Sequence, residues 1–354
     1  DMYNVAVGNN CGEAITTGTF NTLMGGLAGD ALTTGGTNVA VGYLSLSTED
    51  TGRQSVAVGY QALAVQNKDD TNLNTAVGYQ AGLAITTGVS NDIFGGSAGD
   101  ALTTGSFNVA LGRSSLSADT QGSTSVAVGH AALAAQNFTT ATDTFNTAVG
   151  YAAGNDVTTG TKNTLIGGLT GDALTDGVEN VALGYNSLGA DTRGSKSVAL
   201  GKEALKVQNQ TTSVSTYNVA VGFKAGVAVS TGILNTFVGG SAGAASTTVS
   251  NNTAVGAFAF DAGTGADNTA VGSGALGGSS NSGSNNVAVG RDAGNNVTSG
   301  SNLLLLGHDA GMTGSPGGNL TSGNNDLVLG DENISSANIQ VDWTVASDQR
   351  DKTD

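Results

Sequence analysis

A five-residue unit recurs through almost the whole sequence and constrains the fold more than any other feature. The unit reads Asn-x-Ala-Val-Gly, as in residues 4–8, and its closing glycine occurs nineteen times between Gly8 and Gly330. Twelve of the eighteen intervals between these glycines are 17 residues long. The residue before each glycine is apolar, and the one before that is usually alanine. So short a fixed period is typical of a solenoid, in which each coil contacts only its neighbours.

Each 17-residue period contains the elements of one solenoid coil. The apolar run before the glycine is short and often β-branched, so it predicts a strand that ends in a turn. A second, weaker strand is expected further along the coil, as in residues 31–35 and 84–88. A single coil cannot bury its own apolar side, so the coils are expected to stack. The expected fold class is therefore all-β, a β-solenoid or β-roll of about nineteen coils within residues 1–333.

Two residues of the unit have specific expected roles in this stack. The leading asparagine, as at Asn4 and Asn21, is expected to form a ladder in which each amide bonds to the copies above and below it. The closing glycine is expected to adopt a positive φ angle or to allow a close backbone approach at the next corner.

A longer period of about 70 residues groups the coils into sets of four, which begin near residues 4, 74, 146 and 218. In the second coil of each set a bulky residue replaces the usual alanine, and a second glycine follows the core glycine. We interpret a flat alanine face with one large side chain per set as a device that fixes the register of neighbouring chains. The candidate subunit-interface residues are Leu23, Ile93, Leu165 and Phe237.

The first three sets each end in a lengthened stretch, at residues 64–73, 134–145 and 206–217. These stretches are polar and differ from one another, and they fall at one equivalent corner of every fourth coil. Variable loops on a regular scaffold are typical places for recognition, so we expect receptor contacts there. A plain spacing insertion is the alternative.

The composition fits a thin structure held together by its backbone. The chain has 56 glycines, with only 5% aromatic and 11% charged residues, so it has few of the large side chains that fill a wide core. A flexible linker can have a similar composition. Here, however, the 38% of apolar residues recur at fixed positions, which favours an ordered fold.

Charge and cysteine content exclude several classes of partner. The formal net charge is −16, which predicts no nucleic-acid partner and no attraction to an anionic membrane. No apolar run approaches the ~20 residues of a membrane-spanning helix, so no membrane insertion is expected. The single cysteine, Cys11, cannot form an intrachain disulfide, and it occupies a place where sister repeats have alanine. We expect a small buried residue there, and no cofactor or metal.

The acidic and histidine residues do not predict an active site. Asp30, Asp100 and Asp172 recur with the coils, so we interpret them as repeat features rather than as a glycosidase carboxylate pair. His130 and His308 each follow a core glycine and have no identifiable triad partners. An ice-binding array of Thr-Thr-Gly is a further alternative, but the motif occurs in only two coils of four and a flat array would be interrupted.

The repeat resembles the head repeats of trimeric autotransporter adhesins, whose Asn-Ser-Val-Ala-Ile-Gly-type unit builds a trimeric left-handed β-roll. The resemblance covers residues 4 to about 330, although the 17-residue unit here is longer than the usual one of about fourteen. It implies that three copies of this chain associate as a homotrimeric fibre.

Residues 340–352 look like the start of an intramolecular chaperone domain of the endosialidase type, which ends many phage tail fibres and tailspikes. The resemblance implies a domain that trimerises the fibre and then cleaves itself off, here at the Ser347–Asp348 bond. Ser347 would be the nucleophile and Lys352 its general base. Residues 334–354 are thus expected to be a junction to a chaperone, and the chain a piece of a longer protein. An ordinary polar terminus is the alternative.

These features favour a structural fibre protein of a phage or other virion, located on the virion or at an extracellular surface. Its expected partners are further copies of itself and a glycan or protein receptor on the host surface, gripped through multivalency. The alternative is a cellular trimeric surface adhesin or an extracellular filament subunit. We expect no enzymatic activity apart from self-cleavage.

Overall fold

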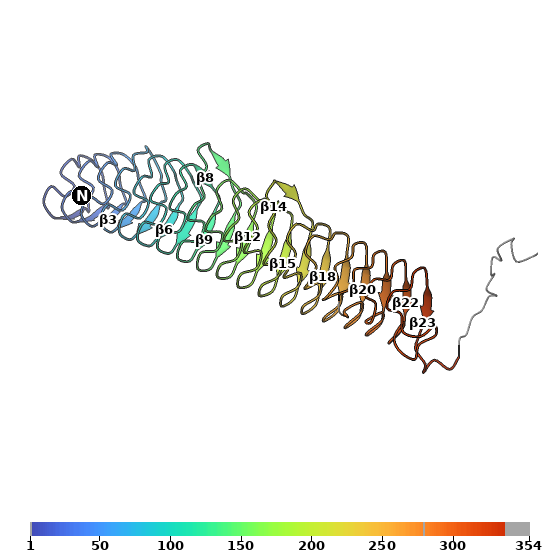
Figure 1. The fold of residues 1–354 in the computed structure, drawn as a ribbon. Coiled ribbons are helices and arrows are strands. Elements are labelled where there is room, and N and C mark those ends of the chain that lie inside the picture. Colours follow the sequence, from blue (N-terminus) through green and yellow to red (C-terminus); the bar gives the residue numbers. More distant parts are fainter. Residues whose placement is uncertain (1, 279, 337–354) are drawn as a thin grey trace, which may run out of the picture.

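The chain forms one long stack of β-coils, with its N-terminus at one end (Figure 1). The computed structural model describes residues 2–278 and 280–336. Nineteen short strands form a single parallel sheet along the stack, and no helix occurs in the described residues. The all-β solenoid expected from the repeat is therefore confirmed, with about 18 turns spaced 17 residues apart rather than nineteen coils.

Every strand of the main sheet is three residues long and coincides with the x-Ala-Val part of the repeated unit. In chain order the strands are β1 (Val5–Val7), β2 (Thr22–Met24), β3 (Val39–Val41), β4 (Val56–Val58), β5 (Thr75–Val77), β6 (Asp92–Phe94), β7 (Val109–Leu111), β9 (Val126–Val128), β11 (Thr147–Val149), β12 (Thr164–Ile166), β13 (Val181–Leu183), β15 (Val198–Leu200), β17 (Val219–Val221), β18 (Thr236–Val238), β19 (Thr253–Val255), β20 (Thr269–Val271), β21 (Val287–Val289), β22 (Leu304–Leu306) and β23 (Leu327–Leu329).

The strands are stacked in register, so equivalent residues of successive coils lie directly above one another. Ala40 of β3, for example, pairs with Ala57 of β4, and Ala57 pairs with Ala76 of β5. In a three-residue strand the central side chain points to one face of the sheet and its two neighbours point to the other. The central residue is buried in all of these strands except β1.

The second strand expected in many coils does not form at the two stretches named for it. Residues 31–35 and 84–88 are turns and bends. In the first coil the backbone N–H groups of Thr16, Thr17 and Gly18 all donate to the carbonyl oxygen of Thr33, at 3.0, 3.3 and 3.1 Å. Three successive N–H groups that converge on one carbonyl describe a turn, because the N–H groups of a strand point alternately to opposite sides.

The asparagine ladder is confirmed. The carboxamide oxygen of Asn4 accepts from the backbone N–H of Asn21 at 2.8 Å and from its side-chain amide at 3.2 Å. The Asn21 amide also donates to the carbonyl oxygen of Gly35 at 3.0 Å, which closes its own coil. Asn21 is fully buried and cannot reach water, so these hydrogen bonds satisfy the polar atoms of its side chain.

The core glycine takes the expected positive φ. At Gly42 φ is +136°, and a Cβ atom built there would fall on the carbonyl oxygen of Gly59 in the next coil. Any side chain would therefore separate the two coils at this corner.

The four bulky second-coil residues lie inside the solenoid, which corrects the expectation that they form a subunit interface. Leu23, Ile93, Leu165 and Phe237 are each 0% exposed. The large side chain is compensated by a glycine in the same coil, since Leu165 packs against Gly171. In the next coil the strand centre is the small Ala182, and the residue equivalent to Gly171 is the buried Leu188. The alternation thus fills a core of constant width.

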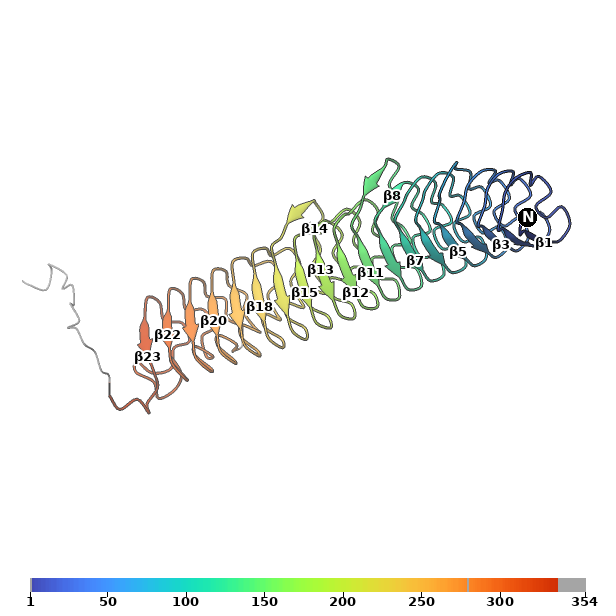
Figure 2. The same cartoon turned by 180° about the vertical axis from the view of Figure 1, so that it is seen from behind.

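The three lengthened stretches interrupt the smooth stack, as does the longer final coil between Gly307 and Gly330. Two of them carry extra two-stranded parallel ribbons, β8 (Gly122–Ser123) with β10 (Thr142–Asp143) and β14 (Gly194–Ser195) with β16 (Val214–Ser215). Both ribbons project from the same side of the stack (Figures 1 and 2). In the first set an isolated bridge between Arg53 and Thr71 takes the equivalent place.

Candidate functional site

The outer face of the main sheet carries a column of apolar residues along the whole stack. At all nineteen strands the residue just before the core glycine is apolar, and the structure turns this residue away from the core. Val7, Leu183 and Leu329, for example, are 54%, 50% and 44% exposed. Among the outward positions of these strands only Asp92 carries a charge. A single chain leaves this face without a partner, which is unusual for a continuous apolar surface of this length.

A column of residues that follow the core glycine borders this face, and it is rich in exposed aromatic rings. Tyr60 stacks on Tyr43 and on Tyr79, with ring centroids 5.8 and 5.3 Å apart. A glycine interrupts the column once per set, in the second coil. A Cβ atom at Gly96 or Gly240 would meet nothing within 4 Å. The column at the border of the sheet therefore has a gap without a side chain once per set.

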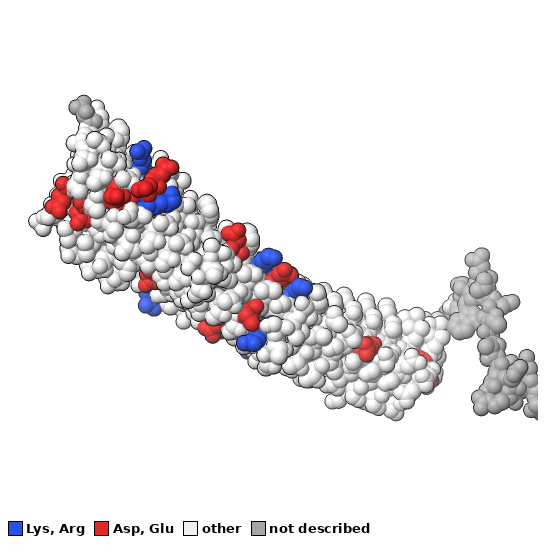
Figure 3. Space-filling model, turned by 90° about the horizontal axis from the view of Figure 1, so that it is seen from above, with Lys and Arg blue, Asp and Glu red and all other residues white. Residues whose placement is uncertain are grey.

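Charged side chains are sparse and grouped. In the view of Figure 3 they gather at a few places, and the longest stretch without them lies toward the C-terminal end of the stack. The ion pairs of lysine and arginine in the described residues are long and lie at the surface, such as Lys162–Glu179 at 3.7 Å. Exposed pairs of this kind contribute about 0–1 kcal/mol each, so charge does little to hold the coils together.

Below each lengthened stretch lies a fully buried carboxylate that holds the loop in place. In the second set Asp119 accepts from the backbone N–H groups of Gly122 and Phe138, each at 3.0 Å, and from the Gln136 amide at 2.6 Å. Gln136 in turn donates to Ser125 at 2.8 Å. These hydrogen bonds stabilise the buried carboxylate, because each of them compensates part of the hydration that the group lost on burial.

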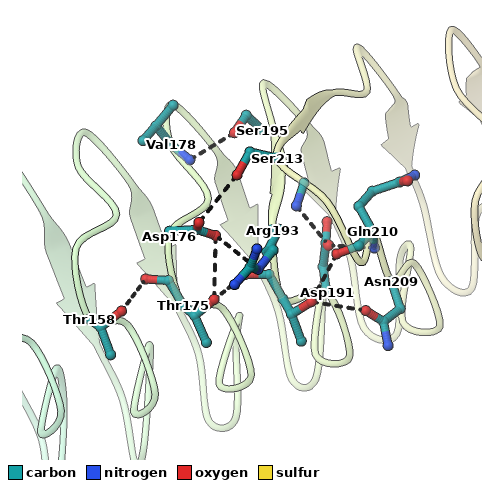
Figure 4. Close-up of polar contacts among 12 residues, drawn as sticks. Thr158, Thr175, Asp176, Val178, Asp191, Arg193, Ser195, Asn209, Gln210 and Ser213 are labelled. Carbon is teal, nitrogen blue, oxygen red and sulfur yellow. Dashed lines mark hydrogen bonds and ion pairs between the residues drawn. The ribbon is translucent and has the colours of Figure 1, made fainter.

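The same arrangement occurs in the third set. Asp191 accepts from the backbone N–H groups of Gly194 and Gln210, at 2.9 and 3.1 Å, and from the Gln208 amide at 2.5 Å. Figure 4 shows Asp191 beside Gln210, and Ser213 of the loop reaching Asp176, which lies two coils earlier. The loop is thus held at its base by Asp191 and farther out by Asp176.

The first set uses a glutamate instead. Glu49 is fully buried and accepts from the Gly52 N–H at 2.8 Å and from the Gln66 and Asn72 amides at 3.0 and 2.9 Å. Burial raises the pKa of the Glu49 carboxyl above its usual value, against the lowering effect of these hydrogen bonds, and the nearby charge of Asp50 raises it further.

These carboxylates were not among the residues predicted from the sequence, although the sequence contains a signal for them. Each acid is followed 17 residues later by a glutamine, in the pairs Glu49–Gln66, Asp119–Gln136 and Asp191–Gln208. In the fourth set the equivalent place is Gly263, which lies against the ring of Phe260, and no long loop follows. Carboxylate and loop therefore occur together.

A groove of about 490 Å³ lies at the corner where the first coils enter the sheet. Its lining combines one exposed aromatic ring, one guanidinium and several hydroxyls: Phe20, Arg53, Gln54, Gly36 and the threonines 17, 19, 34, 37 and 71. Phe20 is 58% exposed and stacks on Tyr3, with ring centroids 5.5 Å apart and planes within 4°. The groove lies beside the first lengthened stretch, to which Thr71 belongs.

One cluster near the C-terminal end has the residue types of a metal site. Its members are His308, Asp309 and Asp331. Arg291 donates to His308 Nε2, so the neutral ring carries its proton on Nδ1 and donates it to Asp331 at 3.1 Å. This bond holds the pKa of the Asp331 carboxyl below its usual value. Because the Nδ1 lone pair is then unavailable, the arrangement acts as a hydrogen-bonded chain rather than as a set of ligands.

The remaining candidates from the sequence have simple outcomes. Ser347 and Lys352 lie outside the described residues. Cys11 is half-buried and packs against the core, where burial raises the pKa of its thiol. His130 stacks on Tyr151 with centroids 5.4 Å apart, and it has no triad geometry around it in the described chain. A search of the described residues for a helix able to cross a membrane finds none.

Comparison with known proteins leaves the geometry as the basis for assigning a function. No family model, no curated protein and no solved structure matches this chain.

Proposed function

We propose that this chain is the shaft of a homotrimeric fibre on a phage or other virion, where it attaches the particle to a host surface. The observation that carries the proposal is the apolar outer column of the main sheet, present at every one of nineteen strands. The core of the single chain does not use these residues, so their apolar character has to serve another contact.

The occupant of this face is a further copy of the chain. The face repeats with every coil along the entire stack, so a partner that covers it has to be equally long and have the same period. A second copy meets both conditions, and self-association of identical faces is the usual way to close such an assembly. The resemblance of the repeat to trimeric adhesin heads favours three copies rather than two.

The test of the assembly is its mass in solution. Static light scattering or native mass spectrometry is expected to give three times the 34.6 kDa of one chain. Charges placed in the apolar column of three fourth coils, as Val58→Asp, Val128→Asp and Leu200→Asp together, are expected to weaken the assembly, because each buries a charge without a partner.

The matched control adds the same charges away from the sheet, as Thr87→Asp, Thr104→Asp and Thr159→Asp, three exposed turn residues. This variant is expected to keep the wild-type mass. A stable wild-type monomer, or an equal loss of assembly in both variants, contradicts the proposal.

A cellular surface adhesin or an extracellular filament is the second candidate, because the same outer face suits either role. Gold-labelled antibodies raised against the chain distinguish the two by electron microscopy. Label on virions supports the virion fibre, and label confined to cell surfaces or free filaments contradicts it.

A further inference from the structure

Two backbone N–H groups in the groove of the first set lack the serine acceptor that six equivalent N–H groups have, and within the described residues the equivalent N–H groups of Thr161 and Ser250 lack one as well. In the second set the equivalent N–H groups of Val89 and Ser106 donate to the hydroxyls of Ser106 and Ser123, at 3.0 and 3.1 Å. The same bond recurs at Val178, Ile233, Ala266 and Ser284, with distances of 3.0 to 3.2 Å. A serine one coil further along therefore serves as the usual acceptor.

The first set lacks both serines. Gly36 stands where the second set has Ser106, and Arg53 stands where it has Ser123. Glycine has no side chain and a guanidinium has no acceptor, so neither can take the bond. Within residues 2–336 (residue 279 apart) the N–H groups of Thr19 and Gly36 have no acceptor. Gly36 is buried at the floor of the groove, where an unbonded N–H is costly unless a ligand or water meets it.

Arg53 adds a positive charge without a partner to the same place. Its side chain is exposed and takes part in none of the ion pairs of the described residues. In a chain of net charge −16 this guanidinium has no carboxylate partner among the described residues, as is also the case for Arg113. The guanidinium and the two N–H groups are donors only, and they suit an oxyanion, most directly a carboxylate matched by the guanidinium fork.

The rest of the lining narrows the ligand class. Phe20 presents a flat apolar ring, and its stacking on Tyr3 limits how that ring can move. The threonine hydroxyls and the Gln54 amide can each donate and accept hydrogen bonds, which suits a ligand rich in hydroxyl groups. A pyranose ring that carries a carboxylate has all three features: a C–H face, hydroxyls and an anion.

We propose that this groove is a binding site for acidic glycans. The sugar carboxylate accepts hydrogen bonds from the Arg53 guanidinium and from the N–H groups of Gly36 and Thr19, and one sugar ring packs on the ring of Phe20. The inference extends the attachment role proposed above by naming the receptor class and its place on the fibre. The other sets lack the site, because Ser123 and Ser195 replace the arginine and Ser106 and Val178 fill the place of Gly36.

The test measures binding of the complete chain to trigalacturonic acid and to a hyaluronan tetrasaccharide by calorimetry, each beside its neutral methyl ester. Saturable binding of at least one acid is expected, with an affinity about tenfold or more above that of its ester, because hydrogen bonds between charged groups are about twice as strong as neutral ones. The esters keep the ring and the hydroxyls, so the difference isolates the carboxylate.

The matched variant combines Gly36→Ser and Arg53→Ser and so installs the serine pair of the second set, which the solenoid already accommodates. It is expected to bind both acids about tenfold or more weakly than the wild type, with an unchanged circular dichroism spectrum. The control Arg113→Ser removes an equal charge outside the groove and is expected to bind like the wild type.

Three results would overturn the proposal: no saturable binding of either acid, equal affinity for acid and ester, or unchanged affinity in the double variant. The mass measurement separates this failure from failure of the proposed fibre. A trimer that binds neither acid refutes only the groove, whereas a monomer that binds an acid through Arg53 refutes only the trimeric shaft.

Discussion

At the scale of single residues, the core exchanges volume within coils and between neighbouring coils: in the first coil of a set both positions are small, and a large side chain of a neighbouring coil lies against the glycine. The structure pairs a large central residue with glycine, as in Leu165 and Gly171, or alanine with leucine, as in Ala182 and Leu188. Gly171 and Leu188 share the same left-handed backbone, with φ of 53° and 52°. The backbone of a coil can therefore hold either member of the pair at this place.

Leu165→Ala is expected to lower the free energy of unfolding by about 3–5 kcal/mol, as for other fully buried leucines that leave a cavity. Adding Gly171→Leu is expected to recover part of this loss, since the coil then has the pattern of its neighbour. Denaturant unfolding of the wild type and the two variants measures both effects. Leu234→Ala, at a 49% exposed leucine, is the control and should change stability little. A double variant less stable than Leu165→Ala would refute the exchange.

The buried Glu49 predicts a dependence of stability on pH. Because burial raises its pKa in the folded chain above the usual 4.5, the folded state favours the protonated carboxyl. Its favourable contribution is fully present below the unfolded pKa and is lost as the pH rises through the folded pKa. The free energy of unfolding of the wild type relative to Glu49→Gln should therefore fall with increasing pH above about 4.5. Denaturant titrations at several pH values measure the difference, and a constant difference would contradict the assignment.

At the scale of elements, the long loops depend on the carboxylates beneath them. Asp191→Ala leaves the N–H groups of Gly194 and Gln210 and the Gln208 amide without their acceptor. We expect faster hydrogen exchange across residues 206–217 and a loss of about 1–3 kcal/mol from the buried groups left unpaired. Ser213→Ala removes only the outer contact to Asp176 and should change exchange near the loop tip alone. Equal exchange in Asp191→Ala and the wild type would show that the loop is held by other contacts.

At the scale of the whole molecule, the set of four coils is the unit that can be removed. Excision of residues 74–145 joins Leu73 to Asn146 and places β4 against β11, where β9 normally lies. Because β4 and β9 are equivalent fourth-coil strands, the core pattern continues, and we expect a folded fibre shorter by about four strand spacings, roughly 19 Å. Electron microscopy and thermal unfolding measure length and stability.

Removal of a single coil is the matched comparison. Deleting residues 163–179 takes away Leu165, whose side chain normally lies against Gly154 of the preceding coil. The resulting void is expected to lower the melting temperature more than excision of the whole set, although fewer residues are lost. Equal melting temperatures would mean that single coils, and not sets, are the interchangeable units.

The sequence by itself determined the solenoid. The spacing of the glycines specifies the length of a coil, and a coil this short can bury its apolar side only by stacking. The asparagine ladder and the positive φ of the core glycine follow from the chemistry of these two residues, and the structure confirms both.

Only the tertiary structure decided which way the strand faces. The unit Val-Ala-Val is apolar at every position, so its pattern is compatible with both orientations of the strand: alanine inside and valine outside, or the reverse. The structure places alanine inside, because the narrow coil has room for it and a bulky residue fits only where a glycine yields space. The groove could not be predicted from the sequence either, because it too depends on how the coils pack. Phe20, Gly36 and Arg53 lie about one period apart in sequence, and only the stacking of the coils brings them onto one surface.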